Sequence, residues 1–561
     1  MREGMKKKKI WDNGINNCDL FRKKKVLILV PHEDDEIITV GTILPILNEN
    51  ECDISIAFAT NGDYHGSDMA TVRMNESLQY CRKMQIKEEN IFFMGFGDYG
   101  ENLQHWYNES KCVPSPAGVS ETYAPSGLKT YSYLKFGEES EYTRENYGKI
   151  LKNILLECKA DIIFCIDCDI HCDHIALSLM FEEVISEIIR EEQYMPLVFK
   201  MFAHDILWMG MQDFYTLNLK SCKSIAQNPH HTYADRFFET YYSWEQRVRF
   251  PIFNEYFSHY AFQNPYRELM KIYKSQYVKY HFPRLLNSDQ VFWLRRTDNL
   301  LLKSKVMASS GNAECFQTLK MFECKDVCKK TNLLEDGQIV WKPADTDNEK
   351  TISIEFESKS KFQEIVFYTG LLCENIMDIE IRTDAGMVIH TGSVAGNGKA
   401  FYLKINELVD CCKVDIRFYG ERIEISKIEI LPFRKRECEY VKIMKDENFI
   451  YQYIAYSQEN VKLSLYCFDG IQGGKIQSED FQWYELVNGE KKLISSDVCL
   501  EKGSKRKIIR VEKKDNPAIY DQVEIIVYSK LHIFFVKYIK RIGYYYNKLI
   551  YKLVRMINRR R

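Results

Sequence analysis

Short apolar runs alternate with longer stretches of helical periodicity over the first half of the chain. Five apolar runs predict buried strands, at residues 26–30, 54–59, 91–94, 162–166 and 198–202. Apolar residues at helical spacing predict helices between them, at residues 37–48, 71–84, 144–158 and 174–190. Strands that alternate with helices form parallel sheets covered on both faces. We therefore expect a Rossmann-like α/β domain over residues 25–300, preceded by a basic segment of residues 1–24.

The pattern changes to short alternating runs near residue 300. The first set predicts a β-sandwich over residues 301–435, with strands at 351–356, 364–368, 377–383, 413–418 and 423–431. The second set predicts a small β-sandwich over residues 436–530, with strands at 449–456, 461–467, 482–487, 507–511 and 522–528. In the second module, the order of Cys467, Trp483 and Tyr520 loosely resembles an immunoglobulin-like domain. A length of 561 residues, too large for one core, agrees with a multidomain chain.

Residues 531–561 predict a basic amphipathic helix. They hold nine Lys and Arg and no Asp or Glu, so residues 1–530 carry −11, which is the total of −2 minus 9. Six of the basic residues share one helical face: Lys537, Arg541, Lys548, Lys552, Arg555 and Arg559. Apolar and aromatic residues form the other face: Phe534, Phe535, Tyr538, Ile542, Tyr545, Leu549, Leu553 and Met556. Such a helix favours an anionic membrane surface. The alternatives are packing on the acidic remainder of the chain, or nucleic-acid binding, which nothing else in the sequence supports.

Acidic and histidine residues gather directly after two of the predicted strands. Pro31 ends the first strand, and the segment HEDDE follows at residues 32–36. The fourth strand runs into DCDIHCDH at residues 167–174. Open α/β sheets bind ligands at the carboxyl ends of their strands. Carboxylates and imidazoles this close repel one another unless a cation lies among them, and they suit Zn²⁺ or another divalent metal. The alternative for the first segment is an acidic helix start, favoured by the helix dipole.

The motifs PHEDDE and HCDH together resemble those of the PIG-L/LmbE-like family of zinc-dependent N-deacetylases. Further matches are FATNG at 58–62, Arg73 and Glu76 in RMNES, GFGD at 95–98, and KIYKSQ at 271–276. The resemblance covers residues 25–300. The family usually has proline at the positions of Glu33 and Cys172. An additional charge on Glu33 beside the ion would raise the pKa of a metal-bound water.

The resemblance implies a role for each residue of the two motifs. His32, Asp35 and His174 would bind the zinc and leave one position open for water. Asp34 would act as the general base, and His171 would stabilise the charged intermediate.

Four further residues are candidates for the site. Asp173 either orients His171 through its second ring nitrogen or caps the following helix. Arg73 and Asp98, from the family motifs, are candidate substrate-binding residues. Trp106 is a third, because it lies in a long loop whose aromatic residues could stack on sugar rings or simply pack the loop.

The function that the resemblance implies is removal of an N-acetyl group from an amino sugar of the N-acetylglucosamine type, in a glycan or glycolipid precursor. The alternatives are metal-dependent hydrolysis of another amide or ester, and a non-catalytic glycan-binding or scaffold protein. The order ASS, LxDG, W and ISIEF in residues 301–435 resembles the galactose-binding-like (discoidin, F5/8 C-type) β-sandwich. Because fold does not fix function, sugar binding and a structural role both stay open for this module.

The sequence predicts a cytoplasmic protein, held peripherally at the inner membrane surface if the tail binds lipid. The basic N-terminus is followed by no apolar run of signal-peptide length, and no run of about 18 apolar residues occurs. The 18 cysteines form no dense framework. Cys165 and Cys168 have a metal or redox spacing, but Cys165 falls inside a predicted strand, which favours a buried structural thiol.

Overall fold

The computed structural model describes residues 19–100, 111–169, 171–203, 218–222, 244–257, 264–320, 323, 339–370, 376–395, 400–435, 437–471, 473–475, 478–501, 503 and 505–558. Most of the predicted basic N-terminal segment and the last three arginines lie outside these ranges. None of the described helices is both long and apolar enough to span a membrane.

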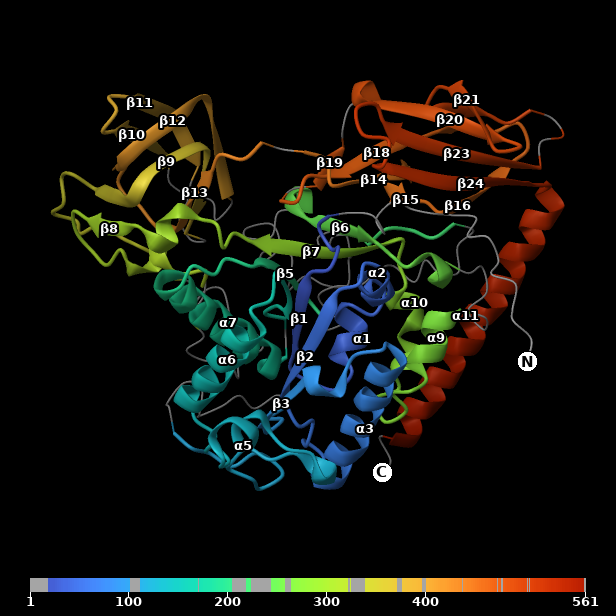
Figure 1. The fold of residues 1–561 in the computed structure, drawn as a ribbon, viewed down its shortest axis with the longest axis horizontal. Helices are drawn as coiled ribbons and strands as arrows, with labels where there is room; N and C mark the ends of the chain where they lie inside the picture. Colours follow the sequence, from blue (N-terminus) through green and yellow to red (C-terminus); the bar gives the residue numbers. More distant parts are fainter. Residues whose placement is uncertain are drawn as a thin grey trace.

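A seven-stranded sheet forms the centre of the N-terminal α/β domain (Figure 1). Its strands are β1 (Lys25–Val30), β2 (Asp53–Thr60), β3 (Ile91–Phe96), β4 (Ile162–Ile166), β5 (Leu197–Met201), β6 (Val248–Pro251) and β7 (Asp289–Arg295). The spatial order is β3-β2-β1-β4-β5-β7-β6. Strands β1 to β5 run parallel, as predicted, whereas β7 and β6 pair antiparallel at one edge. The prediction of a wholly parallel sheet is therefore wrong at this edge.

The sequence gives little sign of β6 and β7 because neither shows simple alternation. Both are buried almost throughout, and each contains a charged residue inside the protein. Arg249 of β6 donates from Nε to Oδ2 of Asp289 of β7, at 2.6 Å. The C-terminal module covers β6: Tyr466 Oη accepts a hydrogen bond from the Arg249 backbone N–H at 3.0 Å. Covering an edge strand in this way protects it from pairing with other chains.

Helices pack on both faces of the sheet (Figure 1). They are α1 (Asp35–Thr39), α2 (Leu44–Glu49), α3 (Ser67–Lys83), α5 (Tyr131–Phe136), α6 (Arg144–Cys158), α7 (Cys172–Glu191), α9 (Pro265–Met270) and α10 (Phe282–Leu285). The single helix predicted over residues 37–48 is broken into α1 and α2. The break is fixed from outside the helix, since the Thr42 carbonyl accepts a hydrogen bond from Phe253 N at 2.8 Å. Gly41 permits the tight turn, because a Cβ there would collide with the Ile37 carbonyl oxygen.

Antiparallel strands fill the middle module, as predicted. They are β8 (Lys305–Ala308), β9 (Thr351–Thr369), β10 (Ile376–Thr383), β11 (Val388–Ala395), β12 (Ala400–Tyr419) and β13 (Ile425–Pro432). Strand β9 joins two predicted strands into one and pairs with β12 along most of its length. Asn299 connects this module to the α/β domain: its Oδ1 accepts from Ile430 N at 2.9 Å, and its Nδ2 donates to the Ile428 carbonyl at 3.1 Å.

The C-terminal module is also built of short strands. They are β14 (Tyr440–Lys445), β15 (Asn448–Phe449), β16 (Gln452–Tyr456), β17 (Asn460–Lys462), β18 (Ser464–Phe468), β19 (Gly473–Lys475), β20 (Phe481–Val487), β21 (Glu490–Ile494), β22 (Asp497–Cys499), β23 (Arg506–Lys513) and β24 (Tyr520–Tyr528). They form a four-stranded sheet, a five-stranded sheet and a two-stranded pair. The chain ends in helix α11 (Lys530–Asn558), which agrees with the predicted C-terminal helix.

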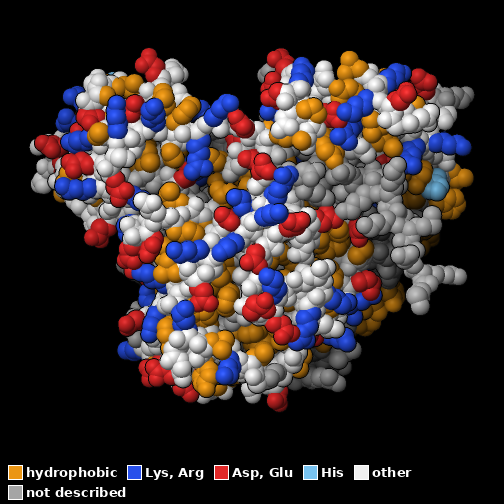
Figure 2. Space-filling model, in the orientation of Figure 1, with side chains coloured by type: hydrophobic (Ala, Val, Ile, Leu, Met, Phe, Trp, Pro, Cys, Tyr) orange, Lys and Arg blue, Asp and Glu red, His pale blue; other side chains and the backbone are white. Residues whose placement is uncertain are grey.

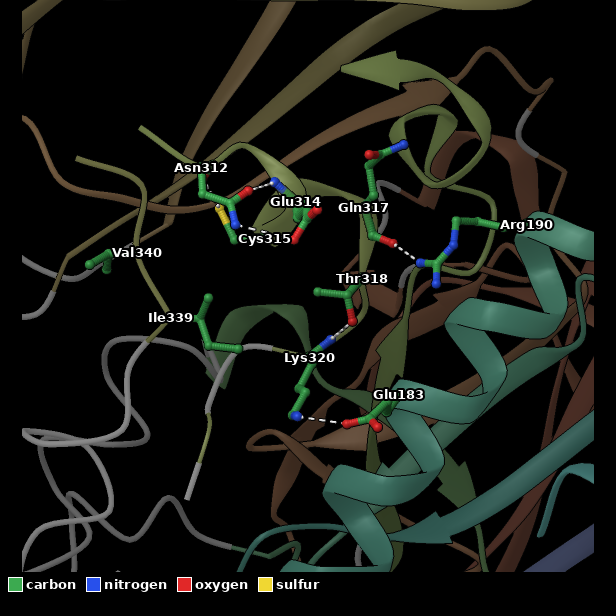
Figure 3. A pocket seen from close by; sticks show the side chains of 10 residues that line it. All are labelled: Glu183, Arg190, Asn312, Glu314, Cys315, Gln317, Thr318, Lys320, Ile339 and Val340. Atoms are coloured by element: carbon green, nitrogen blue, oxygen red, sulfur yellow. Dashed lines mark hydrogen bonds and ion pairs between the residues drawn. The ribbon is translucent and has the colours of Figure 1, made fainter. Parts of the chain in front are cut away.

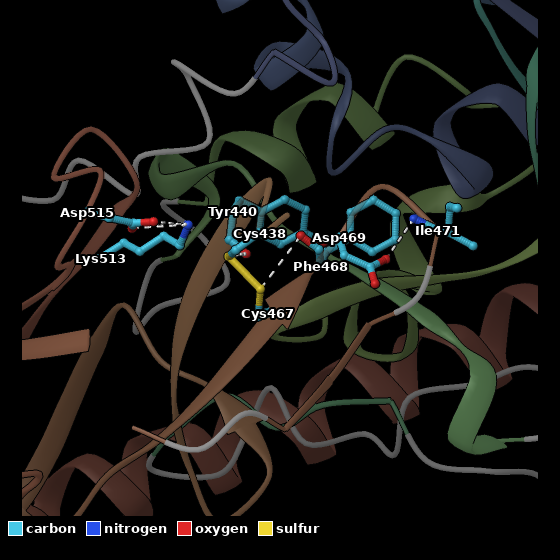
Figure 4. Close-up of a disulfide and its surroundings, with 8 residues drawn as sticks. All are labelled: Cys438, Tyr440, Cys467, Phe468, Asp469, Ile471, Lys513 and Asp515. Atoms are coloured by element: carbon cyan, nitrogen blue, oxygen red, sulfur yellow. Dashed lines mark hydrogen bonds and ion pairs between the residues drawn. A yellow bond between two sulfur atoms is a disulfide. The ribbon is translucent and has the colours of Figure 1, made fainter. Parts of the chain in front are cut away.

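A disulfide joins Cys438 to Cys467 within the C-terminal module (Figure 4). Cys438 lies just before β14, and Cys467 lies on β18, the strand paired with β14. The bond therefore links neighbouring strands of one sheet, unlike the bond between two sheets that marks immunoglobulin domains. Structural disulfides are more frequent in oxidising compartments. The cytoplasmic location stays a prediction, and this disulfide is an observation that argues against it.

Candidate metal centre

The carboxyl ends of β1 and β4 bring the two motifs together. These strands are neighbours and run parallel, so their ends point to the same edge of the sheet. His32 and Asp35 follow β1, and His174 lies in the first turn of α7, which follows β4. The side chains of all three are buried, with at most 4% of each residue exposed.

Three donor atoms from these residues lie close together. His32 Nδ1 is 3.2 Å from both Asp35 Oδ2 and His174 Nε2, and the latter two atoms are 3.3 Å apart. Two ligands of a tetrahedral zinc ion, each about 2.1 Å from the metal, are separated by about 3.4 Å. The donor set and its spacing therefore fit zinc or a similar divalent ion, and the structure brings the predicted ligands together.

The charges of the cluster also favour a cation. Burial, and then repulsion from Asp35, raise the pKa of Asp34 to about 7. Burial lowers the pKa of His174, but the carboxylates of Asp169 and Asp35 outweigh this effect and raise it to about 10. In the protein without metal, a proton on His174 thus partly balances the carboxylates, and a divalent ion could replace it.

Asp169 contacts the cluster through His174. It was not among the site residues predicted from the sequence. Its Oδ2 lies 2.7 Å from His174 Nδ1, the ring nitrogen that faces away from the other two donors. Its Oδ1 accepts a hydrogen bond from the His171 backbone N–H at 2.8 Å. Metal-binding histidines commonly bond a carboxylate through their second nitrogen. The position of this aspartate, five residues before His174, was the sequence feature that could have indicated its role.

Asp173 lies on His32 and not on His171. Its Oδ2 is 3.2 Å from His32 Nε2, compared with 3.8 Å from His171 Nδ1. The N-cap of α7 is His171, whose Nδ1 accepts a hydrogen bond from the Asp173 backbone N–H at 3.3 Å. Neither role weighed for the Asp173 side chain matches this geometry. The carboxylate instead orients His32 in the way that Asp169 orients His174.

Arg73 of α3 connects the cluster to three further carboxylates. Its guanidinium lies 3.5 Å from Asp34 Oδ1, 3.4 Å from Asp98 Oδ2 and 3.6 Å from Glu33 Oε2. Asp98 Oδ1 also lies 3.7 Å from His32 Nε2. Arg73 and Asp98, predicted to bind substrate, are therefore part of the same buried network as the three predicted metal ligands.

Glu33, the departure from the family pattern, is fully buried beside Arg73. Its carboxylate forms no hydrogen bond to the described residues and fills the space above Gly62, where a side chain would collide with it. Gly62 also has φ +60°, a conformation that favours glycine. Burial raises the pKa of Glu33 to about 8, so the neutral acid is favoured near pH 7 in the protein without metal.

The matched segments RMNES and KIYKSQ contact each other. Glu76 accepts hydrogen bonds from the backbone N–H groups of Lys274 and Ser275 at 2.9 and 3.0 Å. Tyr273 is fully buried and donates from its Oη to Glu36, the last residue of PHEDDE. These contacts hold a distant segment against the metal centre.

Trp106, two tyrosines of the same long loop, Tyr123 and Tyr131, and the cysteine Cys165 take different positions. Trp106 lies outside the described residues. Tyr123 donates to Asp63 Oδ2 at 2.9 Å, and Tyr131 is buried and donates to Glu157. Cys165 is buried in β4, and burial raises the pKa of its thiol to about 12, which agrees with a structural role.

A separate cavity of about 660 Å³ lies between α7 and the start of the middle module (Figure 3). Lys320 lines this cavity and donates to Glu183 Oε2 at 2.8 Å, and Arg190 donates to the Gln317 carbonyl at 2.6 Å. The residues that line it include none of the predicted site residues. The cavity is therefore distinct from the metal centre.

Comparison with known proteins gives matches that each cover part of the chain. A protein of Dictyostelium discoideum named "Probable N-acetylglucosaminyl-phosphatidylinositol de-N-acetylase" is 32% identical over 97 residues, which is 17% of this chain and 35% of that protein. The chain thus matches about a third of that relative's length. A solved N,N'-diacetylchitobiose deacetylase from Pyrococcus horikoshii is 18% identical over 34% of this chain and 66% of its own, with a TM-score of 0.22. The module CpGH89CBM32-6 produced by Clostridium perfringens is 20% identical over 24% of this chain and 99% of its own, with a TM-score of 0.17.

A family model gives the match that covers the metal centre. Residues 27–185 match the model described as "PIG-L: GlcNAc-PI de-N-acetylase", and this stretch holds His32, Asp35 and His174. The resemblance to the PIG-L family inferred from PHEDDE and HCDH is thereby confirmed over residues 27–185.

Proposed function

We propose that the α/β domain is a zinc-dependent N-deacetylase that removes an N-acetyl group from an amino sugar of the N-acetylglucosamine type, in a glycan or glycolipid precursor. The observation that carries this proposal is the group of three donor atoms from His32, Asp35 and His174, all within 3.3 Å of one another. The family description and the name of the relative support an acetylated amino sugar as substrate.

A zinc ion held by these three residues would supply a Lewis acid and a bound water of lowered pKa. Asp34 would act as the general base. Its carboxylate pairs with Arg73 and not with the three donor atoms, so it is left to accept a proton. In the protein without metal, burial and the neighbouring Asp35 bring its pKa to about 7, near the optimum for a general base at neutral pH.

His171 would donate a hydrogen bond to the developing oxyanion. In the protein without metal, burial, and then the positive charges of His32 and His174, lower the pKa of His171, which favours its neutral imidazole. Because Nδ1 accepts a hydrogen bond from Asp173 N, the proton of the neutral ring belongs on Nε2. An Nε2–H group can stabilise negative charge on the substrate carbonyl oxygen. Asp34, once it has taken a proton from the water, can then return that proton to the leaving amine.

The test measures amine release from free, nucleotide-linked and lipid-linked N-acetylglucosamine by wild type and Asp34→Asn, with bound zinc measured in both. We expect the variant to keep its zinc and to lose about 10²–10⁴-fold in rate, the usual contribution of a general base. Asp53→Asn is the control, because Asp53 begins β2 at the opposite end of the sheet. Wild type that binds zinc and releases no amine from any of these substrates would refute the sugar deacetylase, leaving another amide or ester, or a binding role.

A further inference from the structure

Helix α11 carries a row of large apolar side chains that face away from the protein. Six of them recur every three or four residues and are each 54–67% exposed: Leu531, Phe534, Tyr538, Ile542, Tyr545 and Leu549. We call these six residues the outer stripe. Scattered apolar side chains are ordinary on a protein surface, whereas a continuous row over five turns marks an interaction site. Figure 2 shows hydrophobic side chains along the edge of the molecule that α11 forms.

The opposite side of α11 attaches the helix to the C-terminal module. Ile533 and Val536, which are 2% and 5% exposed, pack against Ile454 of β16. The first turns of the helix are therefore fixed to the folded protein, and this attachment directs the outer stripe outward.

Basic residues border the outer stripe on one side. At 100° per residue, Arg541, Lys548 and Lys552 fall next to the stripe and away from the packed face of Ile533 and Val536. Lys537 lies between the stripe and Ile533, and its Nζ donates to Tyr456 Oη at 3.3 Å. All four are exposed, and the sequence has no Asp or Glu after residue 530. The surface is thus apolar along its centre and positive along its border.

We propose that α11 lies in the plane of an anionic lipid bilayer, with the outer stripe in the boundary between headgroups and acyl chains. Charged side chains recur along the helix, which suits an orientation parallel to the membrane. The basic border then lies at headgroup level, where anionic lipids attract it. Residues 1–530 carry −11 and are repelled by such a surface, so α11 makes the contact. A second copy of the chain would fit less well, because it would bring another basic border to the same interface.

The experiment uses the full chain with vesicles of phosphatidylcholine plus phosphatidylserine, and with vesicles of phosphatidylcholine alone. We expect co-sedimentation with the mixed vesicles and much less with the neutral ones. Replacing Lys537, Arg541, Lys548 and Lys552 together by Gln should weaken partitioning to the mixed vesicles by about 100-fold or more, because each cation near the surface contributes about fivefold.

Two further variants complete the test. The triple variant Phe534→Ser, Ile542→Ser and Leu549→Ser should abolish binding, and circular dichroism should show an intact fold. The matched control replaces four exposed lysines outside α11 by Gln and should bind as wild type does: Lys342, Lys359, Lys435 and Lys492.

The proposal is overturned if the folded wild type binds neither vesicle, or binds both equally. It is also overturned if light scattering shows a dimer that the triple serine variant abolishes, because a second copy would then cover the stripe. Amine release from a soluble sugar is measured without vesicles in parallel. This readout keeps a failure of lipid binding distinct from a failure of the proposed deacetylase.

Discussion

Two buried groups of charged residues each include an aspartate from the segment after β4, and these two aspartates are two residues apart. The groups are nevertheless built differently. Asp167, directly after β4, belongs to a cluster with Glu182, Lys200 and Arg295. Asp169 belongs to the metal centre. In the first group, which we call the closed cluster, two carboxylates meet two cations in ion pairs of 2.8 to 3.3 Å. Its charges balance within the chain.

The metal centre has no such balance. The carboxylates of five aspartates crowd two histidines and one guanidinium: Asp34, Asp35, Asp98, Asp169 and Asp173 around His32, His174 and Arg73. Burying charge is costly unless it is paired. The closed cluster thus acts as a structural support, and the unbalanced cluster could bind a cation from outside. The following variants test this distinction, from the largest expected effect to the smallest.

The largest effect should come from His174→Ala, which removes one of the three donors of the metal centre. Mutation of a residue that only hydrogen-bonds to a metal ligand lowers metal affinity or activity by about 10–100-fold. Loss of a ligand itself should therefore lower zinc affinity further. We expect less than one zinc ion per chain and no measurable amine release. His390→Ala is the control, since His390 is a surface residue of β11. A variant that kept full zinc occupancy would disprove the ligand assignment.

Lys200→Met should instead act on stability. The side chain is fully buried, and its loss leaves Asp167 and Glu182 with Arg295 as their remaining partner in the closed cluster. Removing one partner of a buried ion pair costs about 3–5 kcal/mol. We expect a lower urea midpoint for the α/β domain, with zinc content unchanged below the transition. Loss of zinc from the folded variant would show that the two clusters are not separate.

The contrast between the clusters also explains how far the sequence could predict the site. His32, Asp35 and His174 were predictable because each lies next to a strand end, and strand ends follow from apolar runs. The closed cluster was not, since Lys200 and Arg295 lie inside strands whose burial hides their charge from a hydropathy pattern. Asp173 was placed on the wrong histidine, because the turn geometry before α7 decides which ring it reaches.

The fold shows the same limit on prediction. The five parallel strands were predicted, because each is a short apolar run. Strands β6 and β7 were not, because their pairing depends on Arg249 and Asp289 and on cover from a module about 200 residues away in the sequence. Local patterns report burial, whereas pairing across domains depends on contacts distant in the chain.

Asp169→Asn should have an intermediate effect on the metal centre. The amide keeps the shape of the side chain and removes the charge that faces His174 Nδ1 at 2.7 Å. We expect zinc affinity to fall by about 10–100-fold, which competition with a chelator would measure. Asp161→Asn is the matched control: Asp161 lies at the other end of β4, where its carboxylate accepts from Lys25 N. If zinc affinity stays at the wild-type value, the charge of Asp169 does not support His174. Its side chain would then serve only to accept the hydrogen bond from the His171 backbone N–H.

The smallest effect should come from Glu33→Gln, which removes a carboxyl group that neither cluster needs for charge balance. Glu33 makes no hydrogen bond to the described residues, and Arg73 keeps Asp34 and Asp98 when Glu33 changes. The amide fills the same space above Gly62. We therefore expect kcat/KM to fall by less than about tenfold, which is under 1.4 kcal/mol, with zinc content unchanged. A larger loss with zinc retained would mean that the charge of Glu33 is needed to hold Arg73 against the general base. In that case the position where the family usually has proline would have become part of the catalytic network of this protein.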